Sequence, residues 1–376
     1  PMSYTMRKFL EGVSDYTVTP LNLILKLSTR VSQLHKPAVM QKVFHIATNH
    51  SQFKKTPKRN ILISSLIKSK KNMLTKKEIV SISGVSTAVI TAAARAGLLK
   101  EELIPRDSPY PLLDPNFKPK EMNSSQSDAC KLIRDFQKQA KFSAILLQGV
   151  TGSGKTEVYL DAVATALKNG EQVLVLLPEI ALTSEFFRRV KDRFGAIPAE
   201  WHSGVSVAER RRVWKMVGSG GAKLVIGARS ALFLPFMNLG LIIVDEEHDH
   251  SYKQEDGVIY NARDMAVLRS SIESSTVILA SATPSLESWV NAKNGKYHNI
   301  YLAERFGQSS LPDVAAIDLR KESLQSNEWI SKTLEKSILK CLDNKEQVLL
   351  FLNRRGYSPT TVCRACLLYT SDAADD

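Results

Sequence analysis

The chain has 376 residues, which is enough for two or three domains, and a formal net charge of +13. No apolar run approaches the ~20 residues needed to cross a membrane, and the N-terminal residues lack a secretory pattern. Four Cys argue for a reducing compartment rather than a disulfide framework. We therefore expect a cytoplasmic protein with no membrane partner.

The positive charge is confined to the first third of the chain. Residues 1–120 carry 20 Lys and Arg against 7 Asp and Glu, whereas the remainder carries 31 of each kind. A basic domain joined to a neutral one predicts a polyanionic partner for the front of the chain. A basic surface that serves only solubility is the alternative.

Residues 58–105 have the pattern of a winged helix-turn-helix domain. A helix at 76–83 is followed by Gly84, which suits a backbone turn with positive φ. Ser86 is a candidate N-cap for the next helix, at 87–95. The apolar residues that follow predict a β-wing. Such domains bind DNA in many proteins and serve as protein contacts in others.

A second domain follows a Pro-rich linker. Five Pro between positions 105 and 119 mark this linker, which we place at 106–120. Apolar strands then alternate with helices from 121 to 303, and this alternation predicts an α/β fold with a parallel sheet covered on both faces. The expected strands lie at 144–147, 173–177, 224–226, 241–244 and 277–279.

Residues 149–156 read GVTGSGKT and fit the phosphate-loop (P-loop) pattern. An apolar strand precedes this stretch and helical spacing follows it, as a nucleotide site requires. Lys155 would reach the β- and γ-phosphates of a nucleotide, and the Thr156 hydroxyl would hold Mg²⁺. The backbone amides that would wrap the phosphates belong to a short set: Gly149, Gly152, Ser153 and Gly154. The alternative is a Gly- and Ser-rich turn before an ordinary helix.

An acidic cluster follows the apolar strand at 241–244. Asp245 would bind Mg²⁺, through water, and Glu246 would polarise the water that attacks the γ-phosphate. A carboxylate at the C-terminal end of a parallel strand lies at the same sheet edge as the P-loop. A merely solvated strand end is the alternative.

Seven motifs occur in one order along the chain: GVTGSGKTEVY, LLPEIALT, HSG, GARSALFLPF, DEEHDHSYKQEDGVIYNARD, ASATPSLES and FLNRRGY. They resemble the PriA family of primosomal replication-restart helicases, in superfamily 2. The resemblance runs from about residue 58 to 366. It implies a RecA-like motor lobe at 121–303 and an ATP-driven 3′-to-5′ DNA helicase that recognises forked DNA and restarts stalled replication by primosome assembly.

The resemblance also implies roles for individual residues. Gln126 matches the glutamine that recognises adenine; on the residues alone it would be an ordinary capping side chain. His248 matches the residue that links the nucleotide site to motif III, and Ser281 and Thr283 of motif III would relay loop movement; a structural His and hydroxyls that only cap the strand are the alternatives. Residues matching motifs that touch the DNA backbone are Thr183, His202, Ser203, Arg229 and Ser230. An aromatic-rich loop that couples single-stranded DNA to hydrolysis would contain Tyr252, Lys253, Gln254 and Tyr260, with the two Tyr rings stacking on bases.

Both ends of the chain depart from the family pattern. Residues 1–57 form a basic segment without an assigned fold, at most a remnant of the domain that binds a 3′ DNA end. Residues 304–366 give only the start of a second RecA-like lobe, including Cys363 and Cys366. This pair would supply two of the four ligands of a Zn²⁺ site; the other two Cys are predicted to be small core residues. Residues 367–376 do not follow the family.

The segments that carry the arginine finger in this family are not found in the sequence. We therefore expect the printed chain to bind ATP and DNA without unwinding. Expected partners are forked and single-stranded DNA, single-stranded DNA-binding protein and helicase-loading proteins of the primosome, with the chain itself a monomer. Two alternatives remain open: a non-enzymatic module that binds forks and recruits partners, and another superfamily 2 nucleic-acid-dependent ATPase.

Overall fold

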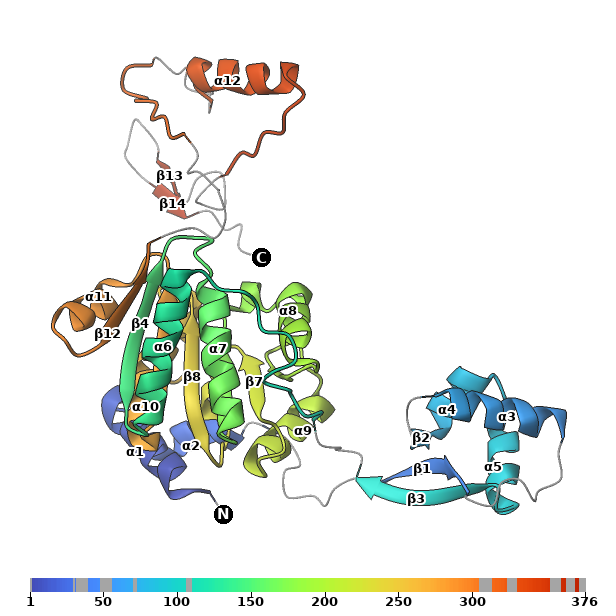
Figure 1. Ribbon diagram of the computed structural model, residues 1–376. Coiled ribbons are helices and arrows are strands. Elements are labelled where there is room, and N and C mark those ends of the chain that lie inside the picture. Colours follow the sequence, from blue (N-terminus) through green and yellow to red (C-terminus); the bar gives the residue numbers. More distant parts are fainter. Residues whose placement is uncertain are drawn as a thin grey trace. The chain divides into compact units, whose positions relative to one another are not determined.

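The computed structural model describes residues 2–29, 31, 40–47, 56–69, 73–105, 110–303, 313–322, 330–351, 360–362 and 369–371. It divides into a first unit, residues 1–309, and a second unit, residues 310–376 (Figure 1). Each unit is described below by itself.

A seven-stranded parallel sheet forms the centre of the first unit, in the order β12-β4-β11-β8-β5-β7-β6. Its strands are β4 (Ser143–Gly149), β5 (Gln172–Leu176), β6 (Ala199–Trp201), β7 (Leu224–Gly227), β8 (Leu239–Asp245), β11 (Thr276–Ser281) and β12 (His298–Leu302). The five strands expected from the sequence all lie in this sheet, so the predicted parallel α/β fold is confirmed. We call this sheet and its covering helices the motor lobe.

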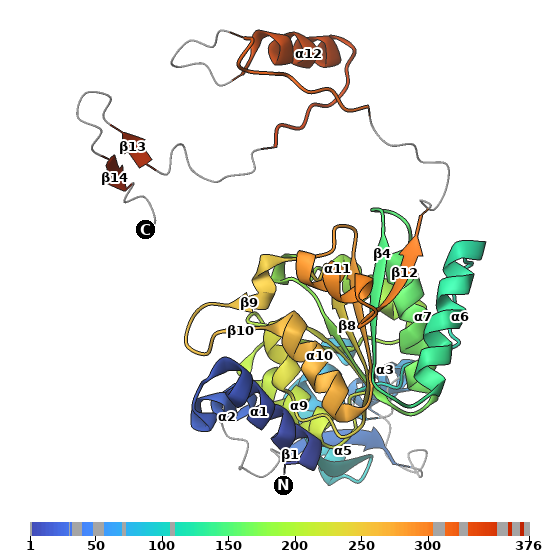
Figure 2. The ribbon, with the colours of Figure 1, turned by 90° about the vertical axis from the view of Figure 1, so that its left-hand side faces the viewer.

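Helices cover both faces of the motor-lobe sheet (Figures 1 and 2). One core lies under α6 (Ser124–Lys138), α7 (Lys155–Lys168) and α8 (Ser184–Phe194). The other lies under α9 (Val207–Gly218) and α10 (Ala262–Glu273). Leu146 of β4 points into the core under α9 and α10, and Leu147 points into the core under α6, α7 and α8. Because successive strand residues face opposite cores, a strand buried on both sides reads as an unbroken apolar run. Beside β12 lies α11 (Leu286–Lys293).

Two helices from the unassigned N-terminal segment complete the second of these cores: α1 (Tyr4–Thr17) and α2 (Leu21–Thr29). The Phe9 ring lies 5.6 Å from the Phe233 ring, centroid to centroid. The Trp214 indole N–H donates to the carbonyl of Ser28 at 2.8 Å. These helices therefore share the core of the motor lobe.

A smaller α/β domain precedes the linker and begins earlier than expected, at residue 40. Its elements are β1 (Met40–Ile46), α3 (Pro57–Lys68), β2 (Leu74–Thr75), α4 (Lys76–Ser83), α5 (Thr87–Arg95) and β3 (Leu99–Pro105). The strands form an antiparallel sheet in the order β2-β1-β3. Leu62, Ile79 and Ile90 of the three helices are fully buried in one cluster. Strand β1 supplies the partner that the predicted β-wing lacked, so the winged-helix pattern extends beyond the predicted boundary.

The two central helices of this domain have the predicted bounds. A capping box joins Thr75 to Glu78 at the start of α4, and Gly84 ends it with φ +67°. Ser86 is the N-cap residue of α5, although its side chain makes no capping hydrogen bond. Among the described residues, no single helix is long and apolar enough to span a membrane. Only α4 and α5 taken together pass on length and composition, and they meet at a bend of 115°.

The second half of the Pro-rich linker lies along the motor lobe. The amide of Asp114 donates to the carbonyl of Phe194 at 2.9 Å. The buried Arg193 donates from Nη1 to the carbonyl of Pro115, also at 2.9 Å. These bonds fix the linker against the end of α8, so the segment that enters α6 is held in place.

The second unit contains α12 (Lys332–Asp343) and an antiparallel pair, β13 (Thr360–Val362) with β14 (Tyr369–Ser371). Cys363 and Cys366 lie outside the described residues. Among the described residues, no group of three or more His, Cys, Asp or Glu is placed to hold a metal ion. The second RecA-like lobe and its zinc pair therefore stay predictions.

The two remaining Cys differ in environment. Cys130 on α6 is 1% exposed, as predicted for a core residue, whereas Cys341 on α12 is only half-buried.

Burial raises the pKa of the Cys130 thiol to about 12. At pH 8 its thiolate fraction is then ~10⁻⁴. We expect iodoacetamide at pH 8 to label Cys341 in the folded chain and to reach Cys130 only in urea, as peptide mapping by mass spectrometry would show. Equal labelling of the two in the folded chain would contradict this burial.

Candidate nucleotide-binding site

The P-loop connects the end of β4 to the start of α7. Gly152 and Gly154 have φ of +83° and +84°, a region that residues with a Cβ rarely adopt. At Gly149 a Cβ would come within 2.6 Å of Ser153 Oγ, so this position is also restricted to glycine. The predicted glycines therefore allow the tight turn that directs the following amides toward a phosphate.

Lys155 is the first residue of α7 and is 8% exposed. Its Nζ donates to the carbonyl of Gly149 at 2.8 Å. Burial lowers the pKa of the Lys155 ammonium, and the carboxylates of Glu246 and Asp245 partly oppose that effect. An added phosphate would therefore stabilise a charge that is now incompletely compensated.

Asp245 ends strand β8, at the carboxyl edge of the sheet. Its Oδ2 accepts from the Tyr159 hydroxyl at 2.8 Å and its Oδ1 accepts from the amide of Glu246 at 3.1 Å. Burial raises the pKa of Asp245, and the bond from Tyr159 opposes this. Both oxygens are thus oriented by fixed donors. The pocket that Asp245 shares with Glu246, Lys155 and Thr156 has a volume of about 450 Å³.

The end of β8 is also linked to the end of β11. His248 Nδ1 lies 2.8 Å from Ser281 Oγ, and the same hydroxyl accepts from the amide of Thr283 at 3.0 Å. Ser281 therefore contacts both of the other residues in the predicted coupling set, His248 through its ring and Thr283 through its backbone amide. A displacement of the end of β8 would therefore be transmitted to the end of β11 through the His248–Ser281 hydrogen bond.

Glu247 is a residue whose importance the sequence did not reveal. It is 1% exposed and its carboxylate accepts from the amide and hydroxyl of Ser285, at 2.7 and 2.9 Å. It also accepts from the Ser288 hydroxyl at 2.9 Å and lies 3.4 Å from Arg263 Nη1. Its only sequence signal is its place within DEEH, because the partners are far along the chain. Glu247 thus fastens the acidic cluster to α10 and α11.

Gln126 lies against the P-loop, near the start of α6, and is 2% exposed. Its Nε2 donates to the carbonyl of Ser153 at 2.9 Å, and its Oε1 accepts from the amide of Asn123 at 3.1 Å. A Cβ on Gly154 would lie 2.3 Å from the same Nε2. The predicted neighbourhood is therefore present, but in this structure both ends of the amide bind protein.

The residues proposed to touch the DNA backbone follow β5, β6 and β7, so they lie along the same sheet edge as Asp245. Arg229 donates from Nη1 to the carbonyls of Ser251 and Lys253, both at 2.9 Å. Thr183 is exposed and caps α8, and His202 is partly exposed. Ser203 and Ser230 are exposed as well.

The loop after the acidic cluster differs from expectation. It contains η4 (His250–Tyr252), β9 (Lys253–Gln254) and β10 (Tyr260–Asn261). Tyr252 is 1% exposed, with its hydroxyl 2.6 Å from the carbonyl of Asp245 and 3.0 Å from that of Leu176. Tyr260 is 3% exposed and packs edge-on against Phe233. The prediction that both rings offer faces for base stacking is therefore wrong for this conformation.

The two polar residues of that loop behave differently. Gln254 is buried and its Nε2 donates to the carbonyls of Asp256 and Val258, both at 3.0 Å, so it shapes the loop. Lys253 is exposed and pairs with Glu255 at 3.2 Å. Of the four residues predicted to meet DNA in this loop, only Lys253 has a side chain available at the surface.

Comparisons with known proteins agree with these features. A family model described as "DEAD/DEAH box helicase" matches residues 123–291. The chain is 46% identical over 264 residues to the replication restart protein PriA of Rickettsia felis, covering 69% of this chain and 41% of that protein. It is 36% identical over 378 residues to PriA of Chlamydia pneumoniae, covering 97% of this chain and 48% of that protein.

The match to a solved structure of RecG bound to a three-way DNA junction covers 51% of this chain and 25% of the RecG chain, at 24% identity and a TM-score of 0.39. The chain spans about half or less of the length of the two curated relatives above. The chain therefore belongs to the family of the replication restart protein PriA, among the DEAD/DEAH box helicases.

Proposed function

We propose that this chain carries the first motor lobe of an ATP-driven 3′-to-5′ DNA helicase that restarts stalled replication. One observation supports this most strongly: Lys155 and Thr156 of the P-loop share one pocket with Asp245 and Glu246. Residues far apart in the sequence thus meet where a nucleotide triphosphate would be bound and cleaved. In such enzymes catalysis depends on positioning and on neutralising charge.

Each group has a distinct task in this proposal. P-loop amides and Lys155 bind and orient the phosphates. Glu246 orients the attacking water and accepts its proton. When bound, Mg²⁺ neutralises charge on the phosphate oxygens. The Thr156 hydroxyl and the Asp245 carboxylate are oxygen donors of the kind that this ion prefers, and they fit it by that chemistry.

The proposed DNA path follows the carboxyl edge of the sheet, along the five backbone-contact residues and Lys253. Contacts to phosphates position a strand without reading its sequence. The basic front of the chain would contribute further affinity for forked DNA. By family, we propose single-stranded DNA-binding protein and helicase-loading proteins as partners, a monomeric state and a cytoplasmic location. Cys363 and Cys366 would contribute two ligands to a Zn²⁺ site.

Replacing Lys155 with Ala tests the nucleotide site. Loss of a charge-assisted contact to phosphate should weaken Mg²⁺-ATP binding about 10- to 100-fold, measured by calorimetry. Binding of forked DNA should change less than about 2-fold, because Lys155 lies in the nucleotide pocket. Lys168→Ala, at the exposed far end of the same helix, is the matched control and should leave both affinities unchanged.

Two outcomes would contradict parts of this proposal. Unchanged ATP affinity in Lys155→Ala would remove the assignment of the P-loop. If the unsubstituted chain binds forked DNA but no ATP, a non-enzymatic recruitment module becomes the better account. Phosphate release with and without single-stranded DNA then measures how fast this chain hydrolyses ATP.

A further inference from the structure

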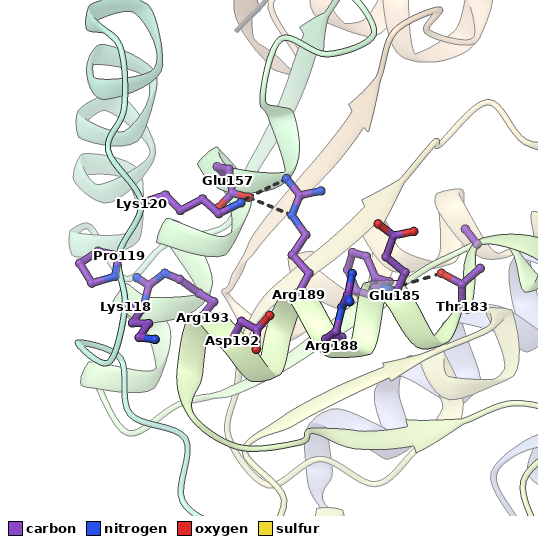
Figure 3. A pocket seen from close by; sticks show the side chains of 12 residues that line it. Lys118, Pro119, Lys120, Glu157, Thr183, Glu185, Arg188, Arg189, Asp192 and Arg193 are labelled. Carbon is purple, nitrogen blue, oxygen red and sulfur yellow. Dashed lines mark hydrogen bonds and ion pairs between the residues drawn. The ribbon is translucent and has the colours of Figure 1, made fainter. Parts of the chain in front are cut away.

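The loops that carry the proposed DNA contacts are held in place in different ways. After β5, Thr183 is itself the N-cap of α8, because its hydroxyl accepts from the amide of Phe186 at 3.3 Å (Figure 3). After β7, the hydroxyl of Ser230 accepts from the indole N–H of Trp201 at 3.2 Å. The loop after β6, at residues 202–204, is held by a residue of the helix that follows it.

Residues 202–204 form a tight turn between β6 and α9, which we call the 202–204 turn. The amide of Gly204 donates to His202 Nδ1 at 3.2 Å, and the amide of Val205 donates to the carbonyl of His202, also at 3.2 Å. Ser203 is exposed, and nothing in the described part of the chain binds its hydroxyl. That hydroxyl is therefore available to a ligand.

Arg210, near the start of α9, binds this turn through two carbonyl groups. Its Nε donates to the carbonyl of Val205 at 2.9 Å, and its Nη2 donates to the carbonyl of Ser203 at 3.2 Å. Because the donors of one guanidinium lie in a single plane, the two bonds fix the directions of both carbonyls. They also place a positive charge on oxygens whose partial negative charge would otherwise repel a phosphate near Ser203.

The charge of Arg210 has no other partner in the described part of the chain. No carboxylate there pairs with it, whereas Arg212, two residues further along α9, pairs with Glu209 at 3.2 Å. Both bonds of the Arg210 guanidinium therefore go to the 202–204 turn and the residue that follows it. An arginine used in this way supports a loop rather than an ion-pair network.

We infer that Arg210 is a positioning residue for the DNA path, because it holds the 202–204 turn with the Ser203 hydroxyl directed at a phosphate of the strand. This inference rests on the proposed function, which places Ser203 beside the DNA backbone. Arginine fits the role because its planar fork binds two carbonyls at once, whereas a lysine ammonium is a point charge. A turn without this support would lose conformational freedom each time it bound a strand, which weakens binding.

Arg210→Lys tests the role because it keeps the charge and removes the fork. Affinity for a fluorescein-labelled oligothymidylate is measured by fluorescence anisotropy. DNA should bind about 5- to 20-fold more weakly, because a hydrogen bond to a charged phosphate is no longer held in place. Affinity for Mg²⁺-ATP should change less than about 2-fold, since Arg210 lies outside the P-loop pocket, and the thermal unfolding midpoint should stay near that of the unsubstituted chain.

Arg210→Met separates positioning from a direct contact between Arg210 and a phosphate. Positioning predicts the same loss in Arg210→Met as in Arg210→Lys, with an unchanged salt dependence of DNA binding. A direct contact would instead leave Arg210→Lys near the original affinity and lower the salt slope by about 0.7 in Arg210→Met. That result would overturn the inference, and so would a loss of ATP affinity equal to the loss of DNA affinity, which would indicate a merely structural role.

The matched control is Arg134→Lys. Arg134 on α6 is also a partly exposed arginine with a fixed guanidinium, but its partner is the α7 carboxylate of Asp161, at 2.9 Å. All three measurements should stay at the values of the unsubstituted chain.

Ser203→Glu tests the DNA path itself, because a negative charge at this exposed position should repel a phosphate and weaken DNA binding at least about 5-fold. If Ser203→Glu binds DNA as the unsubstituted chain does, the proposed path fails and the inference fails with it. If Ser203→Glu weakens binding while Arg210→Lys does not, only the positioning role is lost.

Discussion

A Glu247→Ala variant is expected to lose about 3–5 kcal/mol of unfolding free energy, the usual effect of removing one partner of a buried ion pair. The side chain is fully buried, and Arg263, 3.4 Å away, is 8% exposed. Removing the carboxylate takes their buried acceptor from the Ser285 and Ser288 donors. The guanidinium loses its buried counter-charge and keeps the more exposed Asp264 carboxylate, at 2.8 Å. Urea unfolding followed by circular dichroism measures the loss.

Glu287 supplies a matched control for this prediction. Its carboxylate lies 3.6 Å from the same Arg263 Nη1, but its side chain is 71% exposed. Exposed ion pairs contribute about 0–1 kcal/mol, so Glu287→Ala should cost little. A Glu247→Ala loss no larger than that of Glu287→Ala would show that the buried network does not stabilise the motor lobe.

The parts of the site that the sequence predicted correctly depend on short stretches. The P-loop needs a strand, two positive-φ glycines and a helix start, and all three occur within about a dozen consecutive residues. Asp245 could be placed because an apolar run precedes it, and parallel strands present their carboxyl ends at one edge. Local pattern and topology together suffice for these residues.

The parts that were missed depend on contacts between distant segments. Glu247 meets Ser285 and Ser288, which lie 38 and 41 residues further along. Nothing local distinguishes it from its acidic neighbours. Tyr252 and Tyr260 illustrate the opposite error: an aromatic residue in a loop can face solvent or the core, and only the packing around Phe233 and Leu176 decides. The family resemblance gave these rings a surface role that their burial contradicts here.

Replacing Arg269 with Met should also destabilise the motor lobe strongly, and should loosen α1 in particular. Arg269 on α10 is 0% exposed, and burial lowers the pKa of its guanidinium to about 10, so it stays charged at neutral pH. Its Nη1 donates to the carbonyl of Leu232, and its Nη2 donates to that of Leu234 at 2.9 Å. Met preserves an apolar stem but removes both bonds, so the Leu232 carbonyl loses this donor while the Leu234 carbonyl keeps only the amide of Phe236, at 3.0 Å.

The same guanidinium connects α1 to the rest of the lobe. Its central carbon lies 5.3 Å from the Phe9 ring centroid and 5.1 Å from that of Phe236, so the cation is held between a ring of α1 and a ring beyond η3 (Arg229–Phe233). Removing the cation also leaves its buried ion-pair partner Glu273, 3.7 Å away, without a counter-charge. Breaking such a pair costs about 3–5 kcal/mol, and part of that loss should appear as local opening of α1.

Limited trypsin digestion distinguishes local from global effects, because Arg7 and Lys8 of α1 are cleavage sites within a helix that the core protects. In Arg269→Met these bonds should be cut before the rest of the lobe. Arg269→Lys retains the charge but cannot reach both carbonyls in one plane, so its protection should be intermediate.

Arg7→Met, at an exposed position of α1, is the control for stability, and its unfolding free energy should stay within about 0.5 kcal/mol of the unsubstituted chain. Uniform cleavage across the lobe in Arg269→Met would mean that α1 and the sheet unfold as one unit, and parent-like protection would mean that the cation is dispensable. Since α1 contacts the motor lobe through Phe9 at this residue, cleavage confined to α1 would identify Arg269 as the group that keeps the N-terminal helix attached.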